Sequence, residues 1–174
     1  LSLINDVLDM SRIESGKAII EEQEISLSGT MHEIKDILQG DIKAKSLDAS
    51  FDMADVDDDY VWCDKLRLTQ IVINCLSNAI KFTPAQGTVG VKVVQMPCAL
   101  PGYASYALKI HDQGIGLRKE YAQRIFEPFE RERTSTVSGT QGTGLGMAIT
   151  KNIVDLMGGT IAVQSEKDVG TEFT

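Results

Sequence analysis

Apolar residues recur every three or four positions between residues 64 and 84, in the stretch DKLRLTQIVINCLSNAIKFTP. This spacing predicts a helix with one buried face. Asp64 can cap the start of the helix, and Pro84 prevents its continuation. The apolar stripe consists of Leu68, Ile71, Val72, Cys75, Leu76, Ala79 and Ile80. We expect the rest of the chain to be organised around this helix.

The same periodicity predicts further helices at residues 1–15, 26–45, 118–125 and 147–157. The inner face of the second of these is expected to consist of Met31, Ile34, Ile37, Leu38 and Ile42. The apolar face of the first consists of Leu1, Ile4, Val7 and Leu8, with Gly16 at its end. A helix this short is marginal alone, so we expect its apolar face to pack on a partner outside the chain.

Alternating apolar and polar residues predict strands at residues 17–25, 47–53, 60–63, 88–96, 106–111, 160–165 and 171–174. Residues 97–105 carry two Pro and one Gly, which is typical of a hairpin connection. Residues 127–143 are polar without periodicity, and a loop this long usually covers a ligand or is disordered. The pattern predicts an α/β (α+β) sandwich: one mixed, mostly antiparallel sheet with helices packed on one face, preceded by a helix.

Composition narrows the function classes. The chain has 174 residues and a net charge of −8, which argues against a protein that binds duplex nucleic acid. It has no apolar run of transmembrane length, and we expect no signal peptide in it. Cys63, Cys75 and Cys98 are scattered, which indicates reduced thiols in a cytoplasmic setting rather than a zinc site. The chain lacks an initiating Met and stops within a predicted strand, so we expect it to be a piece of a longer protein.

The polar face of the helix at residues 64–84 is unusual. It carries Arg67, Gln70, Asn74, Asn78 and Lys81, three or four residues apart. Asn is a poor helix former, so a merely solvated face usually carries Glu and Lys instead. The amide oxygens could bind a hard cation and the ammonium group could bind phosphate. The alternative is an ordinary solvated face with Asn present by chance.

Two glycine-containing segments add candidate chemistry. Asp112-Gln-Gly114-Ile-Gly116 follows a predicted strand, where a carboxylate could accept a hydrogen bond from an exocyclic amine and the glycines could let a planar ring approach. An ordinary turn is the alternative. Gly142-Thr-Gly144-Leu-Gly146 opens a predicted helix, whose free N–H groups could cradle phosphate. The alternative is that this segment is a flexible hinge. It matches neither a P-loop nor a dinucleotide fingerprint.

The order of these motifs resembles the catalytic ATP-binding domain of sensor histidine kinases, in the wider family shared with DNA gyrase, the Hsp90 chaperones and MutL. The resemblance covers nearly the whole chain. It implies that residues 1–16 are the end of the second helix of the dimerisation hairpin and that residues 17–174 are the catalytic domain with the histidine kinase/Hsp90-type ATPase fold. It also implies transfer of the ATP γ-phosphate to a His, with Mg²⁺ as cofactor and relay to a response regulator.

The resemblance also assigns roles on the phosphate side of the site. Asn78 would ligate Mg²⁺, and Asn74 would lie beside the metal or the phosphates. Lys81 would contact phosphate, and Arg131 or Arg133 would bring charge from the lid to the γ-phosphate. The cradle for phosphate would consist of Gly142, Thr143, Gly144, Leu145 and Gly146.

On the base side, the resemblance places Phe82 against the adenine and Asp112 on the adenine amine. Gly114 and Gly116 would lie close to the ring, with Thr171 near the base. The segment Phe126-Glu-Pro-Phe129 matches the aromatic box at the base of the ATP lid, which would run to about residue 143.

The acceptor His of the family has no match in the chain. His32 is expected to lie on a helix surface, and His111 is expected to be structural. We therefore expect this chain to bind ATP without phosphorylating itself. A full-length parent would be a homodimer that works with its own dimerisation domain and a response regulator receiver domain, and the sequence leaves open whether that parent is anchored in a membrane.

Two alternatives differ in chemistry. The ATP-hydrolysing branch of the same family places a Glu four residues before the metal-binding Asn, where this chain has Asn74, which cannot take a proton at neutral pH. A pseudokinase that acts only through partners is disfavoured by the intact set of Asn78, Lys81, Asp112 and the glycines.

Overall fold

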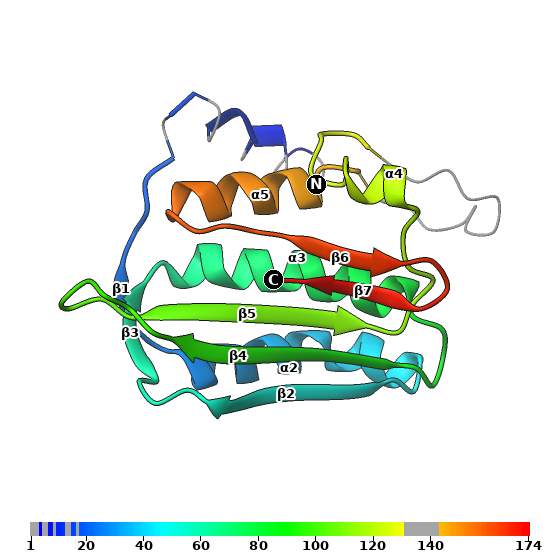
Figure 1. Ribbon diagram of the computed structural model, residues 1–174, viewed down its shortest axis with the longest axis horizontal. Helices are drawn as coiled ribbons and strands as arrows, with labels where there is room; N and C mark the ends of the chain where they lie inside the picture. Colours follow the sequence, from blue (N-terminus) through cyan, green and yellow to red (C-terminus); the bar gives the residue numbers. More distant parts are fainter. Residues whose placement is uncertain (1–3, 5–6, 9, 13–14, 17, 131–142) are drawn as a thin grey trace.

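The computed structural model describes the chain except for residues 1–3, 5–6, 9, 13–14, 17 and 131–142. Its elements are β1 (Gln23–Ser26), α2 (Leu27–Ala44), β2 (Asp48–Asp55), β3 (Tyr60–Cys63), α3 (Lys65–Phe82), β4 (Thr88–Met96), β5 (Ser105–Asp112), α4 (Lys119–Ala122), α5 (Gly146–Leu156), β6 (Val163–Glu166) and β7 (Gly170–Phe173). A five-stranded sheet in the order β2-β4-β5-β7-β6 has its helices on one face (Figure 1). The predicted sandwich is therefore confirmed.

Helix α3 has the predicted bounds because both of its ends are specified locally. The Asp64 carboxylate accepts a hydrogen bond from the main-chain N–H of Arg67 at 3.0 Å, which satisfies one free donor of the first turn. The helix stops at Thr83, directly before Pro84. The predicted stripe is buried except for Ile71, which is half-buried.

Helix α2 is also capped as its sequence suggests, since the Ser26 hydroxyl accepts a hydrogen bond from Gly29 N at 2.9 Å. The prediction that Ile37 faces inward is wrong, because its side chain is 62% exposed. Ile34 and Leu38 are buried on the inner stripe, and Ile37 lies about 100° around the helix from Leu38. Its position on the helix therefore places Ile37 outside the stripe.

The sheet brings the ends of distant segments to one edge. β4 and β5 form an antiparallel hairpin in which Val89 pairs with Asp112. β2 runs parallel to β4, as a crossover through α3 allows. β7 lies between β5 and β6, and its pairing with β5 is limited to the last three residues of β5, where Asp112 lies opposite Thr171. The loop that follows Asp112 therefore begins directly beside β7.

Three predicted elements are shorter than expected. The strand predicted at residues 17–25 is reduced to β1, and β1 pairs with β3 in a separate two-stranded sheet rather than joining the main one. Before β1, the N–H of Glu21 donates to the Asp64 carboxylate at 3.0 Å instead of to a neighbouring strand. α4 covers Lys119–Ala122 and continues as turns, and β6 begins only at Val163.

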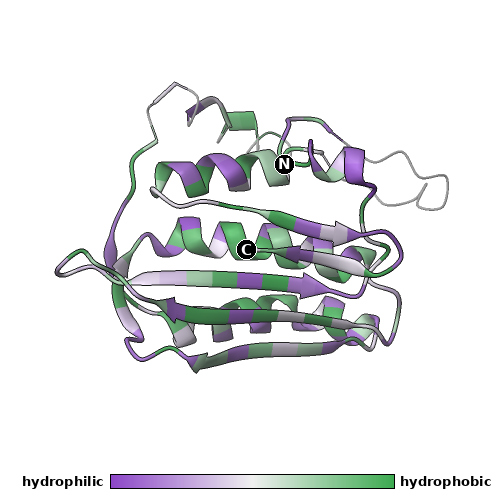
Figure 2. Cartoon of the chain, in the orientation of Figure 1, coloured by the Kyte–Doolittle hydropathy of each residue, from purple (hydrophilic) through white to green (hydrophobic). Residues whose placement is uncertain are grey.

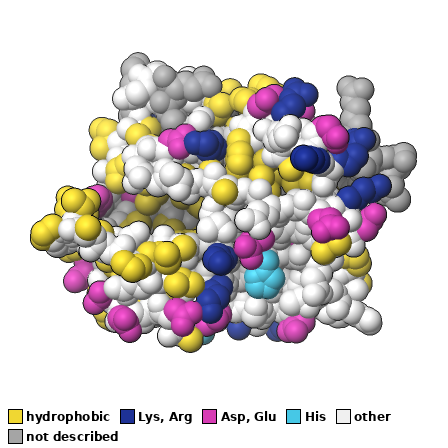
Figure 3. All heavy atoms as spheres, in the orientation of Figure 1, with side chains coloured by type: hydrophobic (Ala, Val, Ile, Leu, Met, Phe, Trp, Pro, Cys, Tyr) yellow, Lys and Arg dark blue, Asp and Glu magenta, His cyan; other side chains and the backbone are white. Residues whose placement is uncertain are grey.

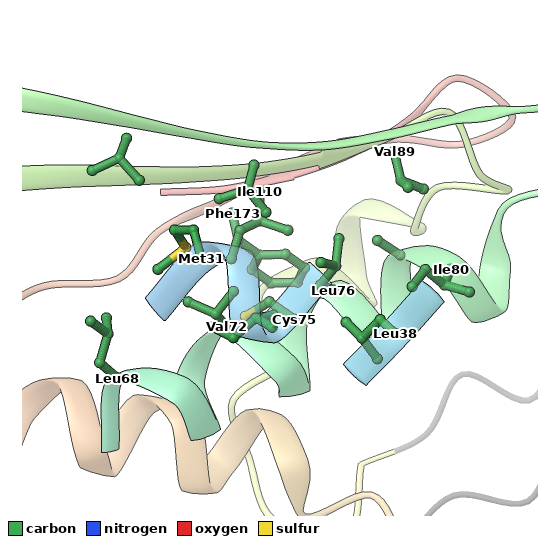
Figure 4. Close-up of a cluster of buried hydrophobic side chains, with 14 of the residues drawn as sticks. Met31, Leu38, Leu68, Val72, Cys75, Leu76, Ile80, Val89, Ile110 and Phe173 are labelled. Atoms are coloured by element: carbon green, nitrogen blue, oxygen red, sulfur yellow. The ribbon is translucent and has the colours of Figure 1, made fainter. Parts of the chain in front are cut away.

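The core lies between the sheet and the helices. Val72, Cys75 and Leu76 of α3 point toward Ile110 and Phe173 of the sheet (Figure 4). Colours alternate along the strands in Figure 2, as expected where only one face of a sheet is covered. The open face carries charged and apolar side chains side by side (Figure 3). Within the described part of the chain, no helix is long and apolar enough to cross a membrane.

The N-terminal segment is helical at residues 4, 7–8 and 10–12. Ile4, Val7 and Leu8 of its predicted apolar face are exposed, and Leu1 lies outside the described residues. Met10 packs against a second apolar cluster that consists of Leu145, Ile149 and Ile153, with Ile71 and Met157 at its border. The segment therefore contacts the body of the chain through Met10, beside α5.

Candidate functional site

The two Asn of α3 face the start of α5. The amide nitrogen of Asn74 lies 3.2 Å from the carbonyl of Gly146 and 3.2 Å from the hydroxyl of Thr150. The amide nitrogen of Asn78 lies 3.3 Å from the sulfur of Met147. Both side chains are half-buried, so this polar stripe is not a freely solvated face. The structure thus brings the Asn stripe and the second glycine segment together.

The end of α3 carries the next two candidates. The ammonium group of Lys81 lies 5.0 Å from the centre of the Phe82 ring, and both side chains are half-buried. The main-chain carbonyl of Phe82 accepts a hydrogen bond from Ile115 N at 3.3 Å. The last turn of α3 is therefore joined to the loop that follows β5.

Asp112 is the last residue of β5, and its carboxylate accepts a hydrogen bond from Gly114 N at 2.7 Å. Burial raises the pKa of the Asp112 carboxyl, while the N–H groups of Gly114 and Thr171 and the nearby His111 oppose that rise. A half-buried carboxylate of this kind has capacity for a further donor such as an exocyclic amine.

Gly114 and Gly116 are required by the packing of the protein itself. A Cβ at Gly114 would lie 2.8 Å from the carbonyl oxygen of Phe82. Gly116 has a φ of +59°, and a Cβ there would lie 1.9 Å from the carbonyl oxygen of Glu166. Both glycines therefore have a structural explanation, whether or not a ring approaches them.

The glycine segment before α5 is described from Thr143 onward, while Gly142, Arg131 and Arg133 lie outside the described residues. The Thr143 hydroxyl accepts a hydrogen bond from Leu145 N at 3.2 Å, and Leu145 is buried. Gly144 has a φ of +75°, and its carbonyl accepts a hydrogen bond from Phe129 N at 3.0 Å. This last bond joins the two ends of the segment at residues 130–143.

Gly146 differs from the other glycines of the site. Among the described residues, the nearest atoms to a Cβ there belong to the side chain of Asn74, at 3.8 Å or more, which is ordinary contact. Leu145, at the N-cap position of α5, makes no side-chain cap hydrogen bond, so no cap from the described residues satisfies the first N–H groups of α5. An uncapped helix start next to two amide side chains suits an anion.

Thr171 and the aromatic box complete the surroundings. Thr171 is a buried residue, and its hydroxyl lies 2.8 Å from the hydroxyl of Ser165. Phe126 is half-buried and meets Phe173 edge to face, with ring centres 6.4 Å apart. Phe129 is 68% exposed with a φ of +63°, a conformation that is rare for a bulky residue.

Sequence reasoning missed the residues that support the site. Ser165 accepts a hydrogen bond from Leu117 N at 2.9 Å and so ties the loop after Gly116 to β6. The Thr150 hydroxyl, in α5, accepts a hydrogen bond from the Asn74 amide nitrogen. Neither residue belongs to a motif, and no local pattern marks them.

Comparison with known proteins gives one family. Residues 63–174 match the model described as "Histidine kinase-, DNA gyrase B-, and HSP90-like ATPase". The chain is 34% identical to the autoinducer 2 sensor kinase/phosphatase LuxQ of Vibrio parahaemolyticus, over 99% of this chain and 20% of LuxQ. It is 37% identical to the circadian input-output histidine kinase CikA of Synechococcus elongatus, over 100% of this chain and 22% of CikA. The chain thus spans about a fifth of the length of these relatives.

Among solved structures, full-length ShkA in complex with AMPPNP is similar to this chain with a TM-score of 0.79 and 29% identity. The match covers 99% of this chain and 34% of ShkA. It supports the arrangement of sheet and helices described above.

Proposed function

The chain belongs to the histidine kinase-, DNA gyrase B- and HSP90-like ATPase family, and on that basis we propose that it is the catalytic ATP-binding domain of a sensor histidine kinase. Its residues 17–174 would bind ATP, and residues 1–16 would be the end of the dimerisation hairpin. The γ-phosphate would pass to a His of the dimerisation domain and then to an Asp of a response regulator. A homodimeric parent is part of the proposal.

One observation carries the proposal: the Asn stripe of α3 lies against the uncapped start of α5. Asn74 and Asn78 reach Gly146, Thr150 and Met147 with their amide nitrogens. Their oxygens accept no hydrogen bond from the part of the chain that is described, and amide oxygens are suitable ligands for a hard cation. Oxygen ligands and helix N–H groups meet here, which is the combination that a metal-bound polyphosphate needs.

The residues present fit Mg²⁺ bound together with ATP. The described residues contain no group of three or more His, Cys, Asp or Glu that could hold a metal ion. A cation at Asn78 would therefore take most of its ligands from phosphate and water, as Mg²⁺ commonly does. When bound, Mg²⁺ would offset the charge of the phosphates.

The remaining side chains would each contact a different part of the nucleotide. Lys81 would attract phosphate, and Phe82 would lie against the adenine. Asp112 would accept a hydrogen bond from the adenine amine, with Thr171 near the base. Arg131, in the lid, would contact the γ-phosphate. Positioning and electrostatics would thus supply most of the catalysis, as in other phosphoryl transfers.

Hydrolysis by this chain is disfavoured by the position of Asn74. Its amide nitrogen donates to Gly146 and Thr150, and an amide cannot act as the general base for water. His32 is exposed on α2, and His111 stacks against Gly90 within the sheet. We propose that neither is the phosphate acceptor.

Calorimetric titration with ATP, in Mg²⁺ and then in EDTA, tests the proposal. We expect Mg²⁺ to strengthen binding, Asp112→Ala to weaken it in both conditions, and Asn78→Ala to remove mainly the Mg²⁺ enhancement. Asp36→Ala, which removes an exposed carboxylate on α2, is the control and should bind as the parent does. Parental affinity in both site variants would refute the assignment of the site.

A further inference from the structure

Lys45 follows α2, but its main chain contacts the turn after α3 and its side chain contacts the end of α3. Its backbone carbonyl accepts a hydrogen bond from Gln86 N at 3.0 Å, which anchors the residue beside the turn after α3. Its half-buried side chain then reaches the last turn of α3. Its sequence position, between a helix and a strand, gives no indication of this contact.

The ammonium group of Lys45 donates to three carbonyls at the end of α3. They belong to Ile80 at 2.8 Å, Lys81 at 2.7 Å and Thr83 at 2.9 Å. An ammonium group has three protons, so these contacts use all of its donors. The last carbonyls of a helix have no partners within the helix and carry its negative partial charge, which a cation stabilises.

We propose that Lys45 is a positioning residue for nucleotide binding, because it holds the backbone that carries Lys81 and Phe82. The proposal rests on the function proposed above. Phe82 lies between Lys81 and Thr83, whose carbonyls accept hydrogen bonds from Lys45, and its own carbonyl accepts one from Ile115 N. A Cβ at Gly114 would be only 2.8 Å from the same oxygen, so the helix end and the loop after Asp112 fit closely.

This geometry has two consequences for a ligand. A shift of the last turn of α3 moves the Lys81 ammonium and the Phe82 ring together, since they are adjacent. It also breaks the contact between Phe82 and the loop that begins at Asp112. Of Lys81, Lys45 contacts only the main-chain carbonyl, and it has no assigned contact with the nucleotide itself, so it acts through the side chains that this backbone carries.

The test compares Lys45→Met with Lys43→Met. Methionine has a similar length but no donor, so it leaves the three carbonyls without the ammonium. Lys43 is exposed in the last turn of α2 and its side chain makes no hydrogen bond or ion pair within the described residues, so it controls for the loss of one positive charge. Lys45→Arg keeps charge and donors but places them on a longer, planar group.

We measure Kd for ATP calorimetrically, well below the melting temperature of each variant, and amide hydrogen exchange at Ile115. We expect Lys45→Met to raise Kd by about 5- to 30-fold, which corresponds to one or two kcal/mol, and to speed exchange at Ile115. Lys45→Arg should fall between the parent and Lys45→Met, and Lys43→Met should match the parent.

A lower melting temperature with parental Kd and parental exchange at Ile115 would reduce Lys45 to a structural residue and overturn the proposal. If Lys45→Met does not fold, Lys45→Gln, which lacks the charge and keeps only two donors, replaces it, and a parental Kd with parental exchange at Ile115 in that variant overturns the proposal too. Absence of ATP binding in the parent would instead refute the proposed function. In that case exchange at Ile115 still tests whether Lys45 holds the helix end.

Discussion

Replacing Gly146 with Ala should stabilise the folded chain and weaken ATP binding at the same time. Gly146 is the first residue of α5, and the nearest atoms to an added Cβ belong to Asn74 at 3.8–4.0 Å. Since an added Cβ clashes with none of the described residues, the variant gains the lower conformational entropy of Ala in the unfolded chain, worth about 0.4–1 kcal/mol. For a chain of this size, that gain raises Tm by about 1–4 °C.

The effect on binding has the opposite sign because of where the methyl group would lie. It would stand at the uncapped start of α5, next to Asn74, where we propose that phosphate is held. Hydrogen bonds to charged groups contribute about 1.5–3 kcal/mol each. Loss of one such bond would raise the Kd for ATP by about 10- to 100-fold.

Thermal melts and calorimetric titration with Mg-ATP measure the two effects separately. Gly40→Ala is the matched control, because Gly40 lies inside α2, is exposed, and has no atom within 4 Å of an added Cβ. It should raise Tm without changing Kd. Parental affinity in a stabilised Gly146→Ala would show that the start of α5 does not hold phosphate, and a lower Tm would refute the steric argument itself.

Three further predictions concern ionisation and capping. The raised pKa of Asp112 means that its ionised form destabilises the fold. This cost is absent below the usual pKa of 3.8 and complete above the raised pKa. Relative to the parent, Asp112→Asn should therefore gain free energy of unfolding between pH 4 and pH 7, as measured by urea titrations. Asp64→Ala removes a buried cap and should cost about 1–2 kcal/mol of unfolding free energy by the same assay. Cys98 is exposed and should react with a thiol reagent at pH 8 in the folded chain, whereas Cys75, whose pKa burial raises to about 12, should react only on unfolding.

Much of the fold could be predicted because its signals are local. The stripe of α3, the cap at Asp64 and the stop at Pro84 all lie within one stretch of sequence, and the structure has the helix at Lys65–Phe82. The hairpin of β4 and β5 was equally local. The partner of β1 could not be predicted, since pairing with β3 depends on contacts between segments far apart in the chain. Local periodicity contains no such information.

The candidate site follows the same rule. Residue types and motif spacing pointed to Asn78, Asp112 and Gly146 separately, and the roles assigned to them came from the resemblance to the catalytic domain of sensor histidine kinases. That Asn78 meets the start of α5, and that Asp112 lies opposite Thr171, comes from the crossover and from the register of β7. Lys45 could not have been predicted, because a lysine after a helix is normally solvated.

Folding and binding make different demands on the residues of this site. Gly114 and Gly116 are required by the fold, since a side chain at either would collide with a main-chain carbonyl, so their presence says little about a ligand. A side chain at Gly146 would meet no such obstacle among the described residues, and ionisation of Asp112 costs stability even though its carboxylate accepts a hydrogen bond from Gly114 N. An Ala at the first position and an Asn at the second would suit the folded chain better, by the arguments above. Residues that cost stability are where function is best sought, and both lie where the nucleotide is proposed to bind.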